Sequence, residues 1–400
     1  MVNKYAVSLD GKSLEILANP PTREPLFPNL CHLRCDYAEE AMPLSRLPFP
    51  SLLSLDLGQL LDTSMFQICL ESFSTFSPNI SSLQIHPQLP WTVNNFNPSW
   101  ICEWHNLQSL TCRFPLGLDA LAPLSRMPPL TRLDFGLSDT FLASDSIPSF
   151  FNLHDMSLNS RSLAPVQRLL SLIRLPVIAD FAVLIDKTPS KEELTSFLNC
   201  VHTSGIGHTV RGLRLYQYIP MLSSRSREGP LLSLEDLRPC KTFSNLRCIN
   251  FSVQWNIGLT DNDLLTLTSA WPHLEELYIN EHWGWNTLGG ITPNGLLRLL
   301  QTCRSLSHIA LAIDTRNYTE LPASPASLGL TLPSMFSIDV IDSIIKADAV
   351  PAITAFFSAF AFCSFRAWDL EVISEYRNEI YRKRWTDVFR EHRPASFQDF

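Results

Sequence analysis

The sequence lacks a surplus of positive charge and has little charge of either sign. Among its 400 residues, Lys and Arg number 31 and Asp and Glu number 39, which gives a net charge of −8. Surfaces that bind nucleic acids are basic, because they must neutralise phosphates. We therefore expect no nucleic-acid partner.

Segments that direct a chain to or through a membrane are also missing. Residues 1–10 show no basic-then-apolar signal pattern. The longest apolar run, residues 350–365, is too short to span a bilayer and is interrupted by Pro351. We expect an intracellular protein, cytoplasmic or nuclear, with no membrane partner. Its ten cysteines, spread from Cys31 to Cys363, are then predicted to be reduced core residues.

Motifs that carry catalysis or hold a cofactor are absent too. Residues 205–207 (G-I-G) lack the third glycine of a dinucleotide loop, and residues 10–13 (D-G-K-S) follow Ala6 where a phosphate loop has its first glycine. No serine stands in a G-x-S-x-G elbow. Cys31 and Cys35 flank a histidine, but no second pair of metal ligands accompanies them. We expect no enzymatic activity, no catalytic residues, no cofactor and no metal.

What the sequence contains instead is a repeating pattern of proline and leucine. It has 29 prolines against 14 glycines, and many prolines stand just before an L-x-x-L-x-L run. Proline has no N–H group and disfavours helix at the preceding residue, so it ends a helix and starts a strand. The clearest runs are P-S-L-L-S-L-D-L (50–57), P-N-I-S-S-L-Q-I (78–85), P-L-T-R-L-D-F (129–135) and P-H-L-E-E-L-Y-I (272–279).

Amphipathic segments lie between these runs. Leucines three and four residues apart predict helices, because such spacing places them on one helix face. Thr260 and Thr292 suit helix N-caps, and Ser190 with Glu193 forms a capping-box pattern. The predicted helices span residues 64–76, 162–175, 190–201, 231–240, 259–271 and 291–303.

A single strand–helix unit cannot bury its own apolar face, so the units must stack. Thirteen candidate units begin at Leu30, Leu52, Ile80, Leu107, Leu130, Leu153, Ile178, Val210, Leu246, Leu274, Leu306, Met335 and Phe362. Their mean length of about 28 residues is typical of leucine-rich repeats. The predicted fold is an irregular α/β solenoid over residues 1–368, shaped like the ribonuclease-inhibitor horseshoe. It should be right-handed, because strand–crossover–strand links are strongly biased that way.

The C-terminal segment differs from the repeats. Residues 369–392 carry apolar residues on one helical face, including Trp385 and Val388. A repeat array needs such a cap over its last open unit. We therefore divide the chain into the solenoid and a capping helix with a tail, residues 369–400.

Within each predicted strand, the residues that alternate with the leucines point away from the core. Solenoid curvature turns such a row into an extended concave surface for a protein partner. A polar strand face can equally be solvated and bind nothing. The candidate contact residues on this face are Arg132, Asp134, Asp155, Arg214, Tyr216, Glu276, Tyr278 and Asn280.

Two aromatic inserts interrupt the repeats. One holds Trp91, Trp100 and Trp104, and the other holds Trp283 and Trp285. Tryptophan is enriched at binding hot spots, so Trp283 and Trp285 are candidate contacts on a rim. The alternative is that the rings fold back and fill gaps between uneven repeats, in which case they would be buried.

The two cycles in residues 259–311 carry a family resemblance. The sequence L-T-D-N-D-L-L-T-L-T-S-A-W-P-H-L-E-E-L-Y-I, followed by I-T-P-N-G-L-L-R-L-L-Q-T-C-R-S-L-S-H-I-A-L, resembles the repeats of F-box/leucine-rich-repeat proteins. Cys303 matches the cysteine that ends the helix in those repeats, and Trp271 replaces it one unit earlier. The proline-led units and the ending R-W-T-D-V-F look like fungal members. The resemblance covers residues 28–389 and is sharpest over 259–311.

This resemblance implies a role in substrate recognition for a cullin-type ubiquitin ligase. In that family the repeats select the substrate, and an N-terminal F-box docks to the ligase adaptor. No L-P-x-E-L-L-x-x-I-F segment stands before Leu26. We therefore expect an adaptor partner only if an F-box lies upstream. The alternative is a scaffold or inhibitor without ubiquitin transfer, as ribonuclease-inhibitor-like proteins are.

Overall fold

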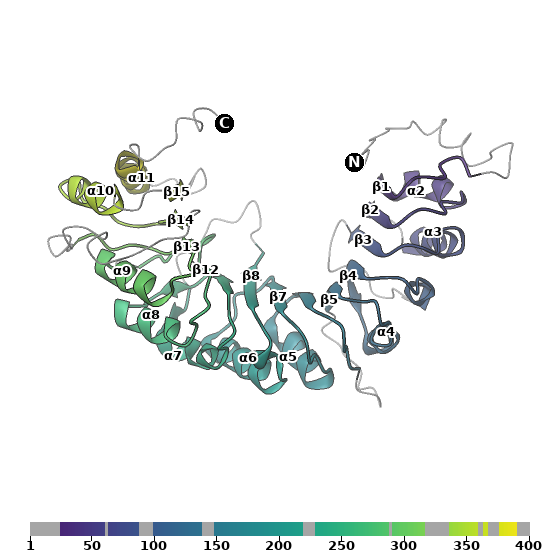
Figure 1. The fold of residues 1–400 in the computed structure, drawn as a ribbon, viewed down its shortest axis with the longest axis horizontal. Coiled ribbons are helices and arrows are strands. Elements are labelled where there is room, and N and C mark those ends of the chain that lie inside the picture. The colour runs from purple at the N-terminus through teal and green to yellow at the C-terminus, as the bar shows by residue number, and fades with distance from the viewer. Residues whose placement is uncertain are drawn as a thin grey trace. The chain divides into compact units, whose positions relative to one another are not determined.

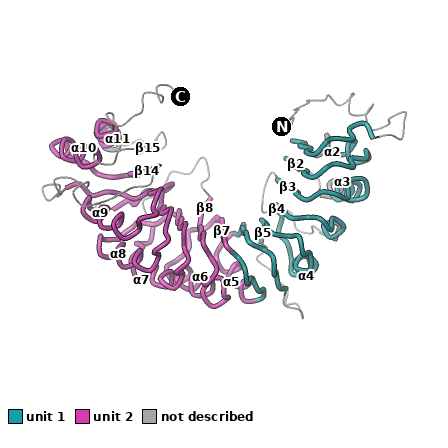
Figure 2. Tube along the Cα trace, viewed as in Figure 1, with its two compact units in different colours: residues 1–160, 172–178 teal, residues 161–171, 179–400 magenta. Residues whose placement is uncertain are grey.

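A computed structural model of the chain describes residues 25–60, 63–87, 99–137, 148–218, 229–287, 290–316, 336–358, 363–366 and 376–389. The chain divides into two compact units. Unit 1 comprises residues 1–160 and 172–178, and unit 2 comprises residues 161–171 and 179–400 (Figure 2). Each unit alternates strands with helices, as the repeating sequence predicts.

The described part of unit 1 is built on parallel strands that pair in chain order. Its helices lie on one side of these strands (Figure 1). The strands are β1 His32–Tyr37, β2 Ser54–Leu60, β3 Ser82–Pro87, β4 Ser109–Leu116, β5 Arg132–Leu137 and β6 Asp155–Ser160. The helices are α2 Ala38–Leu44, α3 Thr63–Phe76, the 3-10 helix η1 Ser99–Glu103 and α4 Leu118–Leu124.

The pairing register of unit 1 aligns the apolar positions of the predicted repeats. Leu107, Leu130 and Leu153, which begin three successive repeats, are buried. Directly after the first two of these leucines, the Thr131 amide donates to the Gln108 carbonyl at 2.9 Å. The apolar position three residues further on is aligned across all six strands. These aligned residues are Leu33, Leu55, Leu83, Leu110, Leu133 and Met156.

Unit 2 repeats the arrangement with more regular helices. Its strands also pair in parallel and in chain order. They are β7 Asp180–Ile185, β8 Gly212–Gln217, β10 Cys248–Ser252, β12 Glu276–Ile279, β13 His308–Ala310, β14 Phe336–Asp339 and β15 Cys363–Arg366. The helices are α5 Leu163–Leu172, α6 Lys191–Thr203, η2 Ile206–His208, α7 Leu234–Leu237, η3 Arg238–Thr242, α8 Asp261–Thr268, α9 Pro293–Thr302, α10 Val350–Ser358 and α11 Tyr376–Phe389.

The strand register of unit 2 also matches the predicted repeat positions, including those of the repeats with the least regular sequence pattern. The markers Ile178 and Val210 are buried just before β7 and β8. The markers Met335 and Phe362 lie outside the described residues, but the strands that follow them pair as predicted. The aligned apolar residues are Phe181, Leu213, Ile249, Leu277, Ile309, Ile338 and Phe365.

Three predicted helix caps are present. The Ser190 hydroxyl accepts from the Glu193 amide, while the Glu193 carboxylate accepts from the Ser190 amide, which completes a capping box. Thr260 caps α8 in the same way. Thr292 accepts from the Gly295 amide at 3.1 Å, with Pro293 in the first turn. Each cap satisfies a backbone donor that the helix itself leaves unpaired.

One predicted helix begins at a different place. Residues 231–240 were expected to be helical, but Leu231–Leu232 form the short strand β9, which pairs in parallel with β11, Asn256–Ile257. The helix starts only after Ser233, whose hydroxyl and amide both contact the Asp236 carboxylate. The cap therefore sets the helix start. The two leucines before it pair instead with strand residues 25 positions further along the chain.

The C-terminal helix has the predicted apolar face where it is described. Trp385 and Val388 on α11 are buried, and the Trp385 indole donates to the Ser343 carbonyl at 3.0 Å. Its ring packs against Phe357 of α10 at 6.1 Å between centroids. Residues 369–375 and 390–400 lie outside the described residues, so the boundary at 369 stays a prediction. Within the described ranges, no helix is both long and apolar enough to cross a membrane.

Candidate protein-binding face

Each sheet has one face packed on helices and one face without them. Along β7 and β12, buried residues alternate with half-buried ones, as the pleat of a strand requires. The described helices of each unit lie on one side of its strands (Figure 1), and we infer that the buried residues point to that side. We call the opposite side the open face of each unit. The predicted contact residues that belong to strands lie on this side, whereas Asn280, Trp283 and Trp285 follow the end of β12.

The three candidate residues of unit 1 lie together. Arg132 on β5 is directly opposite Asp155 on β6, and its Nε and Nη2 donate to Asp155 Oδ2 at 3.0 and 2.9 Å. Asp134 accepts a hydrogen bond from Asn159 Nδ2 at 2.7 Å. Burial raises the pKa of the Asp134 carboxyl, against the opposing effects of Arg113 and Asn159. These candidate charges are therefore satisfied within unit 1.

Further ion pairs occur on the first strands of unit 1. Arg34 Nε lies 2.9 Å from Asp36 and 3.8 Å from Asp56, and His86 lies 3.5 Å from the other oxygen of Asp56. Exposed pairs of this kind contribute little to stability. Their effect is on the charge of the surface, because charged side chains on the open face of unit 1 pair with one another across strands.

In unit 2 the candidates lie around β10. Register places Arg214 and Tyr278 on either side of Asn250, from β8 and β12 respectively, and Tyr216 opposite Ser252. Arg214 Nη1 donates to Asp180 Oδ1 at 2.7 Å. Arg214, Tyr216 and Tyr278 are all half-buried. The charge of Arg214 also acts on Cys248 of β10 and on Tyr216.

Two carboxylates lie beside the two tyrosines. Burial raises the pKa of Tyr216 to about 12, and among the nearby groups the Glu281 and Glu276 charges add to the effect while Arg214 opposes it. Burial likewise raises the pKa of Tyr278 above its ordinary value, with further contributions from Glu276 and Glu281. Both carboxylates therefore act electrostatically on both tyrosines. We call Tyr216, Tyr278, Glu276 and Glu281 the tyrosine–glutamate cluster.

Asn250 contacts Glu281 of this cluster and was not among the predicted site residues. It is only 4% exposed. Its Nδ2 donates to Glu281 Oε1 at 2.9 Å, while its buried Oδ1 has no hydrogen-bond partner among the described residues. The alternation that identified Arg214 and Tyr278 also places residue 250 on this face. Glu281 was missed because it follows the end of β12 and thus falls outside the alternation.

Asn280 is not available to a partner and is withdrawn from the candidate residues. It is 1% exposed and has a backbone φ of 60°. Its side chain accepts from the Val253 amide at 2.9 Å and donates to the carbonyls of Trp255 and Gly284 at 2.8 and 2.9 Å. The left-handed turn carries the side chain inwards, where it satisfies backbone groups of its own unit.

Trp283 and Trp285 are withdrawn for the same reason. They are 5% and 0% exposed, and the Trp285 indole donates to the Ile279 carbonyl at 2.8 Å. Trp104 of the other insert is also buried, with its indole bonded to the Ser77 carbonyl. Trp91 lies outside the described residues, as does the side chain of Trp100. The rings that are described fill space within their own units, which was the alternative interpretation.

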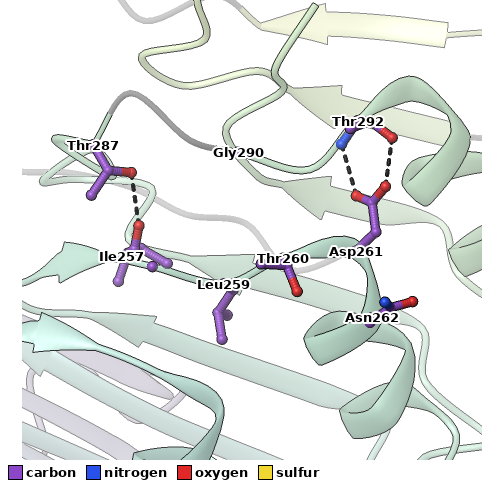
Figure 3. A pocket seen from close by; sticks show the side chains of 9 residues that line it. Ile257, Leu259, Thr260, Asp261, Asn262, Thr287, Gly290 and Thr292 are labelled. Carbon is purple, nitrogen blue, oxygen red and sulfur yellow. Dashed lines mark hydrogen bonds between the residues drawn. The ribbon is translucent and has the colours of Figure 1, made fainter. Parts of the chain in front are cut away.

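A cavity of about 430 Å³ lies at the start of α8 (Figure 3). Its polar groups are engaged with one another. Asp261 accepts from the Thr292 amide and hydroxyl at 2.8 and 2.6 Å, and the Thr287 hydroxyl donates to the Ile257 carbonyl at 2.8 Å. These bonds join the starts of α8 and α9. The cavity thus lies at a joint between repeats, where the side chains of Asp261, Thr287 and Thr292 are already hydrogen-bonded.

Chemically reactive groups are sparse in the described part of the chain. No cluster of three His, Cys, Asp or Glu side chains that could hold a metal ion occurs among the described residues. Every cysteine whose side chain is described is a free thiol. Burial raises the pKa of the Cys69 and Cys112 thiols to about 12, which keeps them protonated at neutral pH.

Comparison with known proteins leaves the family open. No family model matches the chain, and no curated protein matches it. Among solved structures, the chain is similar to one from the yeast complex of Rad7 and Elc1, with 11% identity, a TM-score of 0.32, and coverage of 78% of this chain and 74% of that one. It is also similar to a leucine-rich-repeat protein of Leptospira interrogans, with 15% identity, a TM-score of 0.30, and coverage of 89% and 97%. At these identities and TM-scores, the likeness establishes neither family nor function.

Proposed function

We propose that this chain is a right-handed leucine-rich-repeat solenoid that recognises a protein partner inside the cell. The observation that carries the proposal is the tyrosine–glutamate cluster on the open face of unit 2. Half-buried tyrosines are rigid, amphipathic groups that favour protein contacts. The partner would contact Tyr216, Tyr278 and Glu276 of the predicted residues, together with Glu281.

The more specific form of the proposal is a substrate-recognition module of a ubiquitin ligase. It rests on the resemblance of residues 259–311 to the repeats of F-box proteins. An adaptor would be a partner only through an F-box. The second form is a scaffold or inhibitor that binds a protein without ubiquitin transfer.

Site-directed photo-crosslinking in the native cell tests the proposal. A photoreactive phenylalanine analogue in place of Tyr278 should capture a protein that is also captured from position 216. The matched control is the same analogue in place of Arg298, which is exposed on α9. Capture of the same proteins from all three positions, or of none from positions 216 and 278, would contradict binding at the open face.

The fate of the captured protein separates the two forms. A ligase substrate should become more abundant and less ubiquitinated when this chain is depleted. A partner of a scaffold or inhibitor should keep its abundance and ubiquitination. The measurement is quantitative mass spectrometry of the captured protein with and without the chain.

A further inference from the structure

Among the described residues of unit 2, no lysine or arginine pairs with the two carboxylates that act on Tyr216 and Tyr278. From this we infer that the tyrosine–glutamate cluster, with Asn250 bonded to Glu281, binds the cationic head of a lysine or arginine side chain of the partner. The inference rests on the proposed function, since it names the chemistry by which the partner is recognised there.

The first support is the orientation of the Asn250 amide. An ionised carboxylate only accepts hydrogen bonds, so the contact with Glu281 requires Nδ2, rather than Oδ1, to face it. Oδ1 is then directed away from Glu281, and it is buried with no donor among the described residues. A buried acceptor without a donor is costly, so the site calls for a ligand that donates hydrogen bonds.

The nearest cation of the chain itself does not fill this position. Arg214 is directly opposite Asn250 in the register of β8 and β10. Its Nη1 nevertheless lies 2.7 Å from Asp180 on β7, which is on the other side of β8. Arg214 therefore pairs with β7, and no group among the described residues donates to the Asn250 oxygen.

The second support is the excess of negative charge. Among the described residues, neither Glu276 nor Glu281 forms an ion pair with a lysine or arginine. His282 lies 3.5 Å from Glu281 and is charged only when protonated. Other surface carboxylates nearby are paired, as Glu275 is with Arg247 at 2.7 Å. An incoming cation would thus meet two carboxylates that no lysine or arginine among the described residues neutralises.

The third support is the pair of aromatic rings. Tyr216 comes from β8 and Tyr278 from β12, so they flank the strand that carries Asn250 on both sides. A lysine or arginine head is attracted to the face of such a ring. Because Asn250 is only 4% exposed, neighbouring side chains must reorder to admit the ligand, and a tyrosine has only two torsions to reorder.

These features disfavour other ligands. An anionic group would be repelled by Glu276 and Glu281 and would find no donor at Asn250 Oδ1. A divalent metal ion usually takes three or more protein ligands, and no such cluster occurs among the described residues. A neutral donor could satisfy Asn250 but would gain nothing from the two charges. A cationic side chain can interact with the Asn250 oxygen, the two carboxylates and the two aromatic rings at once.

Titration followed by nuclear magnetic resonance tests the inference on the full chain with asparagine selectively labelled with nitrogen-15. The probes are N-acetyl-arginine amide, N-acetyl-lysine amide and the neutral analogue N-acetyl-citrulline amide. We expect the side-chain signals of Asn250, assigned with Asn250→Ala, to move saturably with at least one cationic probe and not with the citrulline probe.

Matched variants connect this shift to the cluster. The Glu276→Gln/Glu281→Gln variant should weaken binding of the cationic probe by about tenfold or more, because charged hydrogen-bond partners are lost. Glu275→Gln removes a carboxylate that Arg247 already neutralises, so it should change binding by less than about twofold. If the double variant loses its folded spectrum, Glu276→Gln alone gives the same comparison, with a smaller expected effect.

Three results would overturn the inference: no saturable shift, an equal shift with the citrulline probe, or unchanged binding to the variant that lacks both carboxylates. Photo-crosslinking distinguishes this failure from failure of the proposed function. If position 278 still captures a specific protein, the open face binds a partner, but a basic side chain is not what it recognises.

Discussion

Asn280 shows how a polar residue can be fixed inside the core. Its three hydrogen bonds join Val253, Trp255 and Gly284 and close the turn after β12. Asn280→Gly keeps a residue suited to a φ of 60° and removes only the side chain, so it should cost about 2–3 kcal/mol of the free energy of unfolding. Asn280→Ala should cost about 1 kcal/mol more, because alanine is strained at positive φ.

Urea denaturation of the two Asn280 variants measures this difference. Asn262→Ala is a suitable control, since Asn262 is exposed on α8. Equal stability of the glycine variant and the wild-type chain would mean that the hydrogen bonds of Asn280 contribute nothing net.

The buried thiols predict loss of stability in alkaline solution. Burial raises the pKa of Cys69 and Cys112 to about 12, whereas an unfolded cysteine ionises near 8.5. The folded state thus favours the protonated thiol. Its stabilising contribution is fully present below about pH 8.5 and is lost as the pH rises towards 12, with a slope of up to about 1.4 kcal/mol per pH unit for each thiol.

Denaturation midpoints measured from pH 8 to about 11 test this slope for the thiols. Cys112→Ala should lower stability at pH 8, because it leaves a cavity, and should also reduce the alkaline slope. A slope unchanged by Cys112→Ala would show that other groups, such as the tyrosines, cause the alkaline loss.

The direction of the tryptophan rings is a feature that the sequence alone could not predict. Their clustering outside the repeat strands is visible in the sequence, but the direction of each ring depends on the turn that carries it. Gly284, with a φ of 76°, and Asn280 turn the segment back, and Asp342 accepts from the amides of Trp285 and Asn286 at 2.9 Å. A contact with a residue 57 positions away cannot be read from local spacing.

At the scale of elements, the joint between α8 and α9 depends on one threonine. The Thr292 hydroxyl accepts from the Gly295 amide and donates to Asp261, so it caps one helix and ties it to the next. Thr292→Val keeps the shape but loses both bonds. We expect a cost of about 2 kcal/mol, the sum of a cap and a charged hydrogen bond.

The control for this variant is Thr266→Val on α8, whose hydroxyl bonds only to the Asn262 carbonyl of its own helix among the contacts described. Thermal or urea unfolding of both variants gives the comparison. A smaller cost at Thr292 than at Thr266 would contradict the role of the joint.

Strand register was the most predictable feature, and helix starts were less so. The L-x-x-L-x-L spacing defines which residues face the core, and a shift of one residue would expose the whole set, so packing enforces the register. The helix expected from residue 231 begins at Leu234 instead, because Leu231–Leu232 pair with Asn256–Ile257. The sequence pattern determines the strand register, whereas the start of this helix depends on pairing with residues far along the chain.

At the scale of the whole molecule, the repeats predict that disturbances spread only between neighbours. Each strand in a stacked array packs mainly on the strands beside it, so stability is a sum of local terms and interfaces. Leu277 is fully buried on β12, between β10 and β13. Removing its side chain should therefore affect those strands first.

Hydrogen exchange of Leu277→Ala tests this locality. A buried Leu→Ala change costs about 2–5 kcal/mol, so amides of β10, β12 and β13 should exchange on the order of tens to thousands of times faster. Amides of β1, β2 and β3 in unit 1 should keep their wild-type rates, because no described contact joins them to Leu277. The control Leu133→Ala, on β5 of unit 1, should reverse the pattern. Uniform acceleration throughout the chain in both variants would instead show that the array unfolds as one cooperative block, and the nearest-neighbour description would then fail.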